Sequence, residues 1–135
     1  MRPAILVIFA ALLSFGAPAA AQSQDKQPTP EEMAAKEAER LESLLSLETW
    51  QVFYVDSTLQ HDYAAMQAEL GELQRAKVEN YDLYIDIRDK WMEQIDRTYK
   101  KYFTPDQWTK YLKSGAARAQ KARDKRKAKA EGKKK

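Results

Sequence analysis

Apolar side chains recur at spacings of three and four residues over two long stretches of the chain. The first stretch runs from about Glu48 to Lys77 and the second from Tyr81 to Tyr102. Such spacing places the apolar side chains on one side of an α-helix, so each stretch predicts a long helix that needs a partner. The apolar positions are Val52, Val55, Leu59, Tyr63, Met66, Leu70 and Leu73, then Tyr81, Ile85, Met92, Ile95, Tyr99 and Tyr102.

The boundary between these two helices has two candidate positions, Gly71 and Asn80. The apolar stripe continues through Gly71, and the residues after it are good helix formers. A boundary at Asn80 puts Arg75 and Lys77 in a last helical turn and Asp82 in a first turn, where the helix dipole favours their charges. We therefore expect a turn at Asn80 and an antiparallel hairpin of two long helices, with one unbroken helix as the alternative.

A further helix is predicted to begin at Thr29, which precedes Pro30 and Glu32. A threonine cap and a glutamate three residues later satisfy each other's backbone N–H groups, and proline suits the first helical position. The apolar residues that follow are sparse, so we expect a weak N-terminal helix after a linker at residues 22–29.

The most specific local motif is Phe103-Thr104-Pro105-Asp106-Gln107. Thr104 is the capping residue, Pro105 takes the first helical position, and Gln107 can accept the N–H of the cap. A short C-terminal helix is predicted from Pro105 to about Ser114, with Gly115 as a left-handed stop.

The region between Glu31 and Thr104 contains no proline and a single glycine. A sheet protein needs turn residues about every 8 to 12 positions, so this scarcity predicts an all-α fold. The chain has no cysteine, which excludes disulfides, thiolate metal sites and thiol catalysis. We expect one helical domain over residues 30–114.

Residues 1–21 have the three-part pattern of a secretory signal peptide. Arg2 precedes an apolar run from Ala4 to Phe15, and small residues follow as far as Ala21. A membrane-spanning helix needs about 20 apolar residues, and this run has only about a dozen. We therefore expect cleavage near Ala21 and a periplasmic or secreted protein.

Charge divides the rest of the chain into an acidic body and a basic tail. Residues 22–112 carry 11 basic and 18 acidic residues, whereas residues 113–135 carry 11 basic and two acidic residues. The tail has no side chain more apolar than alanine, so it cannot bury enough surface to offset the entropy lost on folding. We expect residues 115–135 to be a low-complexity, solvated arm, although their composition also favours helix. Its candidate contacts to an anionic surface are Lys121, Arg123, Lys125, Arg126, Lys127 and Lys129.

No pattern in the sequence indicates catalysis or a cofactor. A serine nucleophile with a base, a glycine-rich phosphate loop and a metal-ligand signature are all missing. His61 is the only histidine, and its neighbours point to other sides of the helix, so we expect a surface residue. The acidic residues at positions 82, 86, 89, 93 and 96 are interleaved with basic ones, which favours a solvated, salt-bridged face over a cation site.

Aromatic residues are numerous, and a single hairpin cannot hide all of them. One interpretation places them in the core and in an interface between two copies of the chain. The other leaves an exposed apolar patch that binds a partner, formed by side chains beside the main stripes: Tyr54, Tyr84, Ile87 and Trp91.

The motif at Phe103–Gln107, the leader, the helical body and the lack of cysteine together resemble the LTxxQ-motif proteins of Gram-negative periplasms, the Spy/CpxP-like family. That family has two such motifs, and the second copy here has Leu47 and Gln51 at the matching spacing. Phe103 replaces the leucine of the family, and Glu48 replaces the capping threonine, so the first helix could also run straight through residue 48. The chain is also similar to LTxxQ-like small secreted proteins of Bacteroidetes, from which no activity follows.

The resemblance implies a small helical cradle, often dimeric, that binds unfolded envelope proteins without ATP or acts as an envelope-stress accessory. Its partners would be unfolded or partly folded envelope proteins, bound on the apolar and aromatic side of the helices. The charge pattern suggests another function, in which the tail docks a structural protein on an anionic envelope surface. Nucleic acid is not expected as a partner, because an exported protein seldom meets it.

Overall fold

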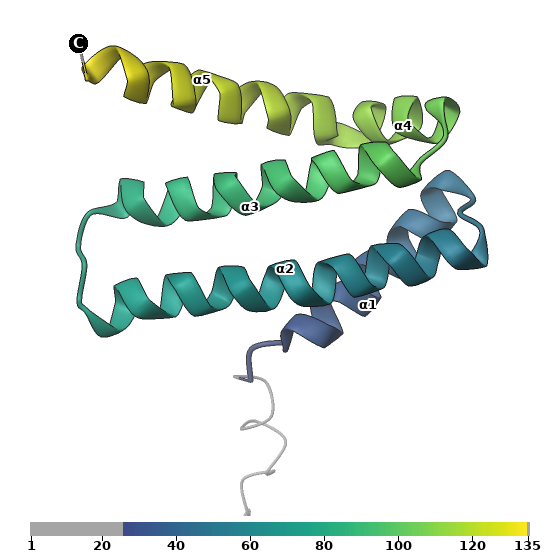
Figure 1. Ribbon diagram of the computed structural model, residues 1–135, viewed down its shortest axis with the longest axis horizontal. Helices are drawn as coiled ribbons and strands as arrows, with labels where there is room; N and C mark the ends of the chain where they lie inside the picture. Colours follow the sequence, from purple (N-terminus) through teal and green to yellow (C-terminus); the bar gives the residue numbers. More distant parts are fainter. Residues whose placement is uncertain (1–25, 135) are drawn as a thin grey trace, which may run out of the picture.

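The computed structural model describes residues 26–134, and every regular element in that range is a helix (Figure 1). The predicted leader and its cleavage site near Ala21 lie outside the described residues. The all-α class is confirmed, and none of the described helices is long and apolar enough to cross a membrane. The elements are α1 (Pro30–Leu45), α2 (Thr49–Arg75), α3 (Tyr81–Tyr102), α4 (Pro105–Tyr111), the π-helical segment η2 (Leu112–Ala116) and α5 (Ala117–Lys133).

Helix α1 begins at the predicted cap. The Thr29 hydroxyl accepts the Glu32 N–H at 3.2 Å, and the Thr29 N–H donates to the Glu32 carboxylate at 2.9 Å. The expectation of a weak helix is wrong, because α1 contributes four fully packed core residues. Two of them are alanines. Because an alanine side chain is small, α1 lies close against α2, and the contact is filled without a large apolar residue at these positions. These core residues are Ala34, Ala38, Leu41 and Leu45.

A sharp break separates α1 from α2. Ser46 ends α1 in the left-handed region, with φ of 51°, and its N–H donates to the Glu42 carbonyl. Leu47 is buried, and the Glu48 N–H donates to the Gln51 side-chain oxygen at 2.9 Å. The alternative of one helix running straight through residue 48 is therefore wrong, because Gln51 satisfies the backbone at this break without a capping threonine.

Helices α2 and α3 run in opposite directions, side by side, and are joined by residues 76–80 (Figure 1). Asn80 caps α3, because its side-chain oxygen accepts the Asp82 N–H at 3.1 Å. The predicted helix boundary at Asn80 is confirmed. Gly71 lies inside α2, and the alternative of one unbroken helix is wrong.

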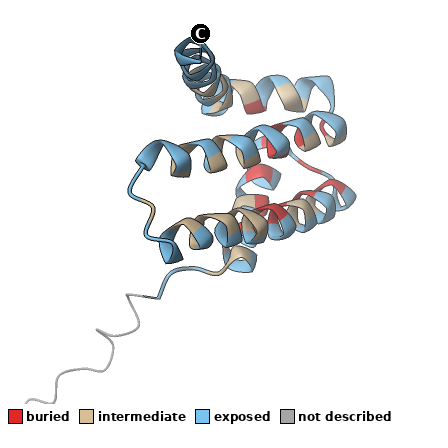
Figure 2. Cartoon of the chain, turned by 60° about the vertical axis from the view of Figure 1, so that its left-hand side comes forward, coloured by how far each residue is buried: buried red, intermediate tan, exposed pale blue. Residues whose placement is uncertain are grey.

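The buried side chains gather at one end of α2 and α3, where α1 and α4 pack against them (Figure 2). No residue from Tyr63 to Gln94 is buried, because α1 covers only part of α2 and the C-terminal helix lies against α3 through polar contacts. The core consists of Ala34, Ala38, Leu41, Leu45, Leu47, Val55, Leu59, Ile95, Tyr99, Phe103 and Tyr111.

The basic tail forms a helix, which corrects the expectation of a solvated arm beyond residue 114. The predicted stop at Gly115 does have a positive φ of 120°, but the chain enters α5 directly afterwards and returns along α3 (Figure 1). Helix α5 has no buried residue. It is held by polar contacts to the acidic side of α3, such as that of Arg126 with Asp89, so its position does not require apolar burial.

Candidate functional site

The two copies of the sequence motif meet at the packed end of the molecule. The Gln51 Nε2 donates to Gln107 Oε1 at 2.7 Å, and the Gln107 Nε2 donates back to Gln51 Oε1 at 3.1 Å. Each side-chain oxygen also accepts the backbone N–H of its own helix cap, Glu48 or Thr104, at 2.9 Å. Two glutamines that are 56 positions apart therefore tie the start of α2 to the start of α4.

The other motif residues complete this junction. Leu47 and Phe103 are the apolar members of the two copies, and both are buried. Thr104 accepts the Gln107 N–H at 3.2 Å, and Pro105 is the first residue of α4. The predicted capping box at Thr104 is confirmed. The two motif copies together fix the end of the bundle at which α2 begins.

Three aromatic side chains are exposed on the first turns of α2, and we call Trp50, Phe53 and Tyr54 the aromatic patch. Their exposed fractions are 48%, 64% and 44%. The ring centroid of Tyr54 lies 6.2 Å from that of Trp50 and 5.6 Å from that of Phe53, both edge to face. Tyr54 also stacks on Tyr102 at 4.9 Å, which fixes the patch against α3. Since an aromatic side chain carries roughly 150–250 Å² of surface, the three half-exposed rings present roughly 300 Å².

The patch is exposed because α2 turns its other side to the core. Gln51, Val55 and Leu59 are buried at helical spacing, which leaves positions 50, 53 and 54 on the outer side. Sequence reasoning did not assign Trp50 and Phe53 to a binding surface. Their position outside the apolar stripe of α2 was the signal that could have identified them.

The structure does not bring the four predicted partner-binding residues together. Tyr54 lies in the aromatic patch, whereas Tyr84, Ile87 and Trp91 are half-buried farther along α3. The Tyr84 hydroxyl donates to a carbonyl of the turn at 2.9 Å, and the Trp91 Nε1 donates to Glu69 at 3.1 Å. The Tyr84 bond fixes the turn, and the Trp91 bond joins α3 to α2.

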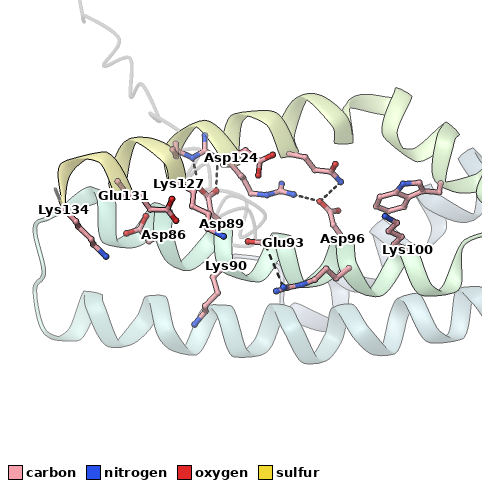
Figure 3. A pocket seen from close by; sticks show the side chains of 16 residues that line it. Asp86, Asp89, Lys90, Glu93, Asp96, Lys100, Asp124, Lys127, Glu131 and Lys134 are labelled. Atoms are coloured by element: carbon pink, nitrogen blue, oxygen red, sulfur yellow. Dashed lines mark hydrogen bonds and ion pairs between the residues drawn. The ribbon is translucent and has the colours of Figure 1, made fainter.

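A charged groove of about 470 Å³ runs between α3 and α5. Acidic and basic side chains of both helices face this space (Figure 3). At one end, the buried Asp96 pairs with Arg123, and accepts the Tyr111 hydroxyl at 2.6 Å and the Gln120 amide at 3.1 Å. Farther along, Arg126 makes two hydrogen bonds to Asp89, at 2.7 and 2.8 Å. The acidic face of α3, which we expected to be solvated, is therefore in contact with the tail at positions 89 and 96. We call Asp96 with its three partners the Asp96 cluster.

Three ionisable groups at or near this groove, Tyr99, Tyr111 and Arg126, have raised pKa values. Burial raises the pKa of Tyr111, and its hydrogen bond to Asp96 raises that pKa further. Burial also raises the pKa of Tyr99, to which the neighbouring Tyr63 and Tyr111 contribute. The hydrogen bond to Asp89 raises the pKa of Arg126. The tyrosines therefore stay neutral and the arginine stays charged at physiological pH.

The cations of the tail divide into two sets. Four of them line the groove, together with the two acidic residues of the tail, Asp124 and Glu131: Arg123, Arg126, Lys127 and Lys134. The opposite side of α5 is exposed and carries basic residues at helical spacing, with no acidic residue among them. We call this set the basic stripe: Arg118, Lys121, Lys125, Lys129 and Lys133.

The described residues offer no metal centre. Residues 26–134 contain no group of three or more histidine, cysteine, aspartate or glutamate side chains that could hold a metal ion. The His61 side chain is 75% exposed, and its Nδ1 lies 2.8 Å from an oxygen of Asp62, which places it on the surface.

Comparison with protein-family models, with curated proteins and with solved structures yields no match to this chain.

Proposed function

We propose that this protein is an exported, non-enzymatic binding protein that captures unfolded or partly folded segments of envelope proteins without ATP. The observation that carries the proposal is the aromatic patch. Its roughly 300 Å² is comparable to the largest apolar patch of a typical monomer, which is often functional. Aromatic rings suit this task because they offer a large contact area and lose little side-chain entropy on binding.

The setting of the patch supports this proposal. Tyr54 stacks on Tyr102, and the glutamine pair ties the helix that carries the patch to α4. The patch is therefore presented on a rigid base, so that ordering it costs little on binding. The meeting of the two motif copies also supports the resemblance to the LTxxQ-motif family, whose members bind unfolded envelope proteins.

A homodimer is part of the same proposal. Near the turn, α5 lies only against the acidic side of α3, and the apolar side chains of α2 and α3 there, including Leu70, Leu73 and Ile85, are only half-buried. A second copy would cover this face with the same kind of surface. The solution mass of the protein tests it: a dimer mass is expected, and a monomer at all concentrations would contradict it.

An aggregation assay tests the capture of unfolded segments. The wild-type chain is expected to suppress the aggregation of an unfolded model client at near-stoichiometric amounts. The triple variant Trp50→Ser, Phe53→Ser, Tyr54→Ser should lose most of this effect while its circular dichroism stays helical. The matched control is Tyr81→Ser with Leu83→Ser, because these apolar side chains are also exposed, by 66% and 42%, but lie at the other end of the hairpin. No suppression by the wild type, or an equal loss in the control, would contradict the proposal.

The basic stripe favours a second candidate function, in which α5 docks the protein on an anionic envelope surface. Its five cations face away from the acidic body, so a negatively charged bilayer can approach them without meeting the body. Each lysine or arginine near such a surface contributes about 1 kcal/mol. Lys125→Gln with Lys129→Gln should therefore weaken binding to phosphatidylglycerol vesicles by about 30-fold. The control Lys127→Gln with Lys134→Gln removes the same charge from the groove side, and an equal loss there would contradict docking through the stripe.

A further inference from the structure

A shallow hollow lies beside the aromatic patch, between α1 and α2. Its volume is about 220 Å³, and Phe53 of the patch forms one of its walls. One water molecule occupies about 30 Å³ in the liquid, so the hollow has room for a long side chain. The residues that line it are Ala35, Ala38, Glu39, Val52, Phe53 and Asp56.

The lining combines an apolar base with two carboxylates. Ala38 is buried and Val52 is half-buried, so they offer an apolar surface to an aliphatic stem. Glu39 comes from α1 and Asp56 from α2, and neither carboxylate forms an ion pair with any residue in the range 26–134. An apolar guest would remove water from these carboxylates without replacing its hydrogen bonds, which is unfavourable. The hollow therefore selects a side chain with an apolar stem and a cationic end.

Asp56 adds a specific demand for a hydrogen-bond donor. Its Oδ2 accepts the Gln60 amide at 2.8 Å, whereas its Oδ1 is buried and accepts no hydrogen bond from the described residues. An acceptor without a donor costs free energy, so a small rotation of the Asp56 side chain that brings Oδ1 to a donor of the ligand recovers it. Phe53, exposed by 64%, gives a ring face on which a planar cation can stack.

The geometry points to an arginine side chain as the occupant of this hollow. The guanidinium group has several donors in one plane, so it can bond to two carboxylates while it stacks on an aromatic ring. A lysine ammonium has the charge but not the planar set of donors. This inference rests on the proposed function: the captured segment places apolar side chains on the aromatic patch and an adjacent arginine in the hollow.

The body of the protein favours the same partners at longer range. Residues 22–112 have 18 acidic and 11 basic residues, a net charge of −7, which attracts basic segments and repels acidic ones. The specificity for arginine arises in the hollow, where Glu39 and Asp56 lie beside the exposed ring of Phe53.

Fluorescence anisotropy with labelled peptides tests the inference. The peptides share one apolar, aromatic-rich sequence and differ at one position, which is arginine, lysine or glutamine. The arginine peptide is expected to bind about tenfold more tightly than the glutamine peptide, the effect of one charge-assisted bidentate contact. Equal affinities of these two peptides would overturn the arginine site and leave the proposed function intact. If neither peptide binds, the proposed function fails as well, and if lysine binds as tightly as arginine, the guanidinium assignment is wrong.

Two variants of the full chain locate the effect. Asp56→Asn keeps the shape of the side chain and should reduce the affinity for the arginine peptide to that for the glutamine peptide, without changing the latter. The matched control Glu72→Gln removes one negative charge from an exposed position of the same helix, outside the hollow. It should leave the tenfold preference in place. An equal loss of preference in both variants would show that overall charge, and not the hollow, selects arginine.

Discussion

The Asp96 cluster provides the most detailed prediction, because it is the buried contact that holds α5 against α3. In Asp96→Asn the side chain keeps its shape, and its oxygen can still accept the Tyr111 hydroxyl. The Arg123 guanidinium, whose side chain is only 11% exposed, loses its counterion. Removing one partner of a buried ion pair usually costs about 3–5 kcal/mol, because the other charge stays buried.

The structure predicts a smaller cost here. Helix α5 has no buried residue and follows Gly115, so Arg123 can reach water when α5 moves away from α3. The loss is then limited to the contacts that dock α5. Besides the pair of Arg123 with Asp96, whose attraction is largely offset by the desolvation of the two charges, these are a hydrogen bond from Gln120 of about 1 kcal/mol and the exposed pair of Arg126 with Asp89, of about 0.5 kcal/mol. We therefore expect Asp96→Asn to lower the free energy of unfolding by about 1–2 kcal/mol.

Urea unfolding and amide hydrogen exchange measure the two parts of this prediction. The amides of α5 should exchange much faster in Asp96→Asn, while those of α1 and of the packed end of α2 keep their protection. The control Asp89→Asn removes only the exposed pair and should cost about 0.5 kcal/mol. A loss of about 4 kcal/mol with α5 still protected would refute a movable α5, because Arg123 would then remain buried without its partner.

Three further predictions concern separate parts of the molecule. The pKa of Tyr99 is raised in the folded state, so the stabilisation that comes from keeping this side chain neutral is fully present below about pH 10 and is lost as the pH rises above it. Tyr99→Phe should therefore make the fall of the free energy of unfolding above pH 10 shallower by about 1.4 kcal/mol per pH unit. In a double-mutant cycle measured by urea unfolding, Gln51→Ala and Gln107→Ala should show a coupling energy of about 1–2 kcal/mol, and additive effects would contradict a direct pair. Gly115→Ala should destabilise by about 1–3 kcal/mol through backbone strain alone, because φ is 120° and no atom lies within 4 Å of an added Cβ; an unchanged melting temperature would contradict this.

The helix boundaries could be predicted because the contacts that fix them are local. Thr29 and Glu32 bond across one helical turn, as do Thr104 and Gln107, and Asn80 bonds two residues ahead. Such contacts depend only on residue types at fixed short spacing, which the sequence displays directly. The sequence is less clear about the break at Ser46. Glu48 is a poor match to the usual cap, and Gln51, which accepts the Glu48 N–H, is held by the distant Gln107.

The packing of α1 and α5 could not be predicted in the same way. Helix α1 joins the core through Leu41 and Leu45 and also through two alanines, which hydropathy patterns cannot distinguish from surface residues. Helix α5 is held by Arg123 on Asp96, 27 positions earlier in the chain, and such a pairing leaves no local signal. The basic tail therefore suggested an arm in solvent, although half of its candidate cations face the acidic residues of α3.

The candidate site was predicted only in part for a related reason. Tyr54 was assigned to a partner surface because it lies beside the apolar stripe, and this criterion applies equally to Trp50 and Phe53. Tyr84 and Trp91 meet the same criterion, but their polar atoms bond within the molecule and they are half-buried. Which aromatic residues stay exposed depends on which side of α2 faces the core and on the polar contacts between α2, the turn and α3, and both follow from tertiary packing.

The most direct test of client capture at the aromatic patch is site-specific photocrosslinking. A photoreactive phenylalanine analogue replaces Phe53 in one preparation and Leu83 in another, and each protein is illuminated with an unfolded client. Both positions are exposed, by 64% and 42%, so the analogue is accessible in either case. We predict strong crosslinking to the client from position 53 and little from position 83. Equal crosslinking from both positions, or none from position 53, would contradict binding at the aromatic patch.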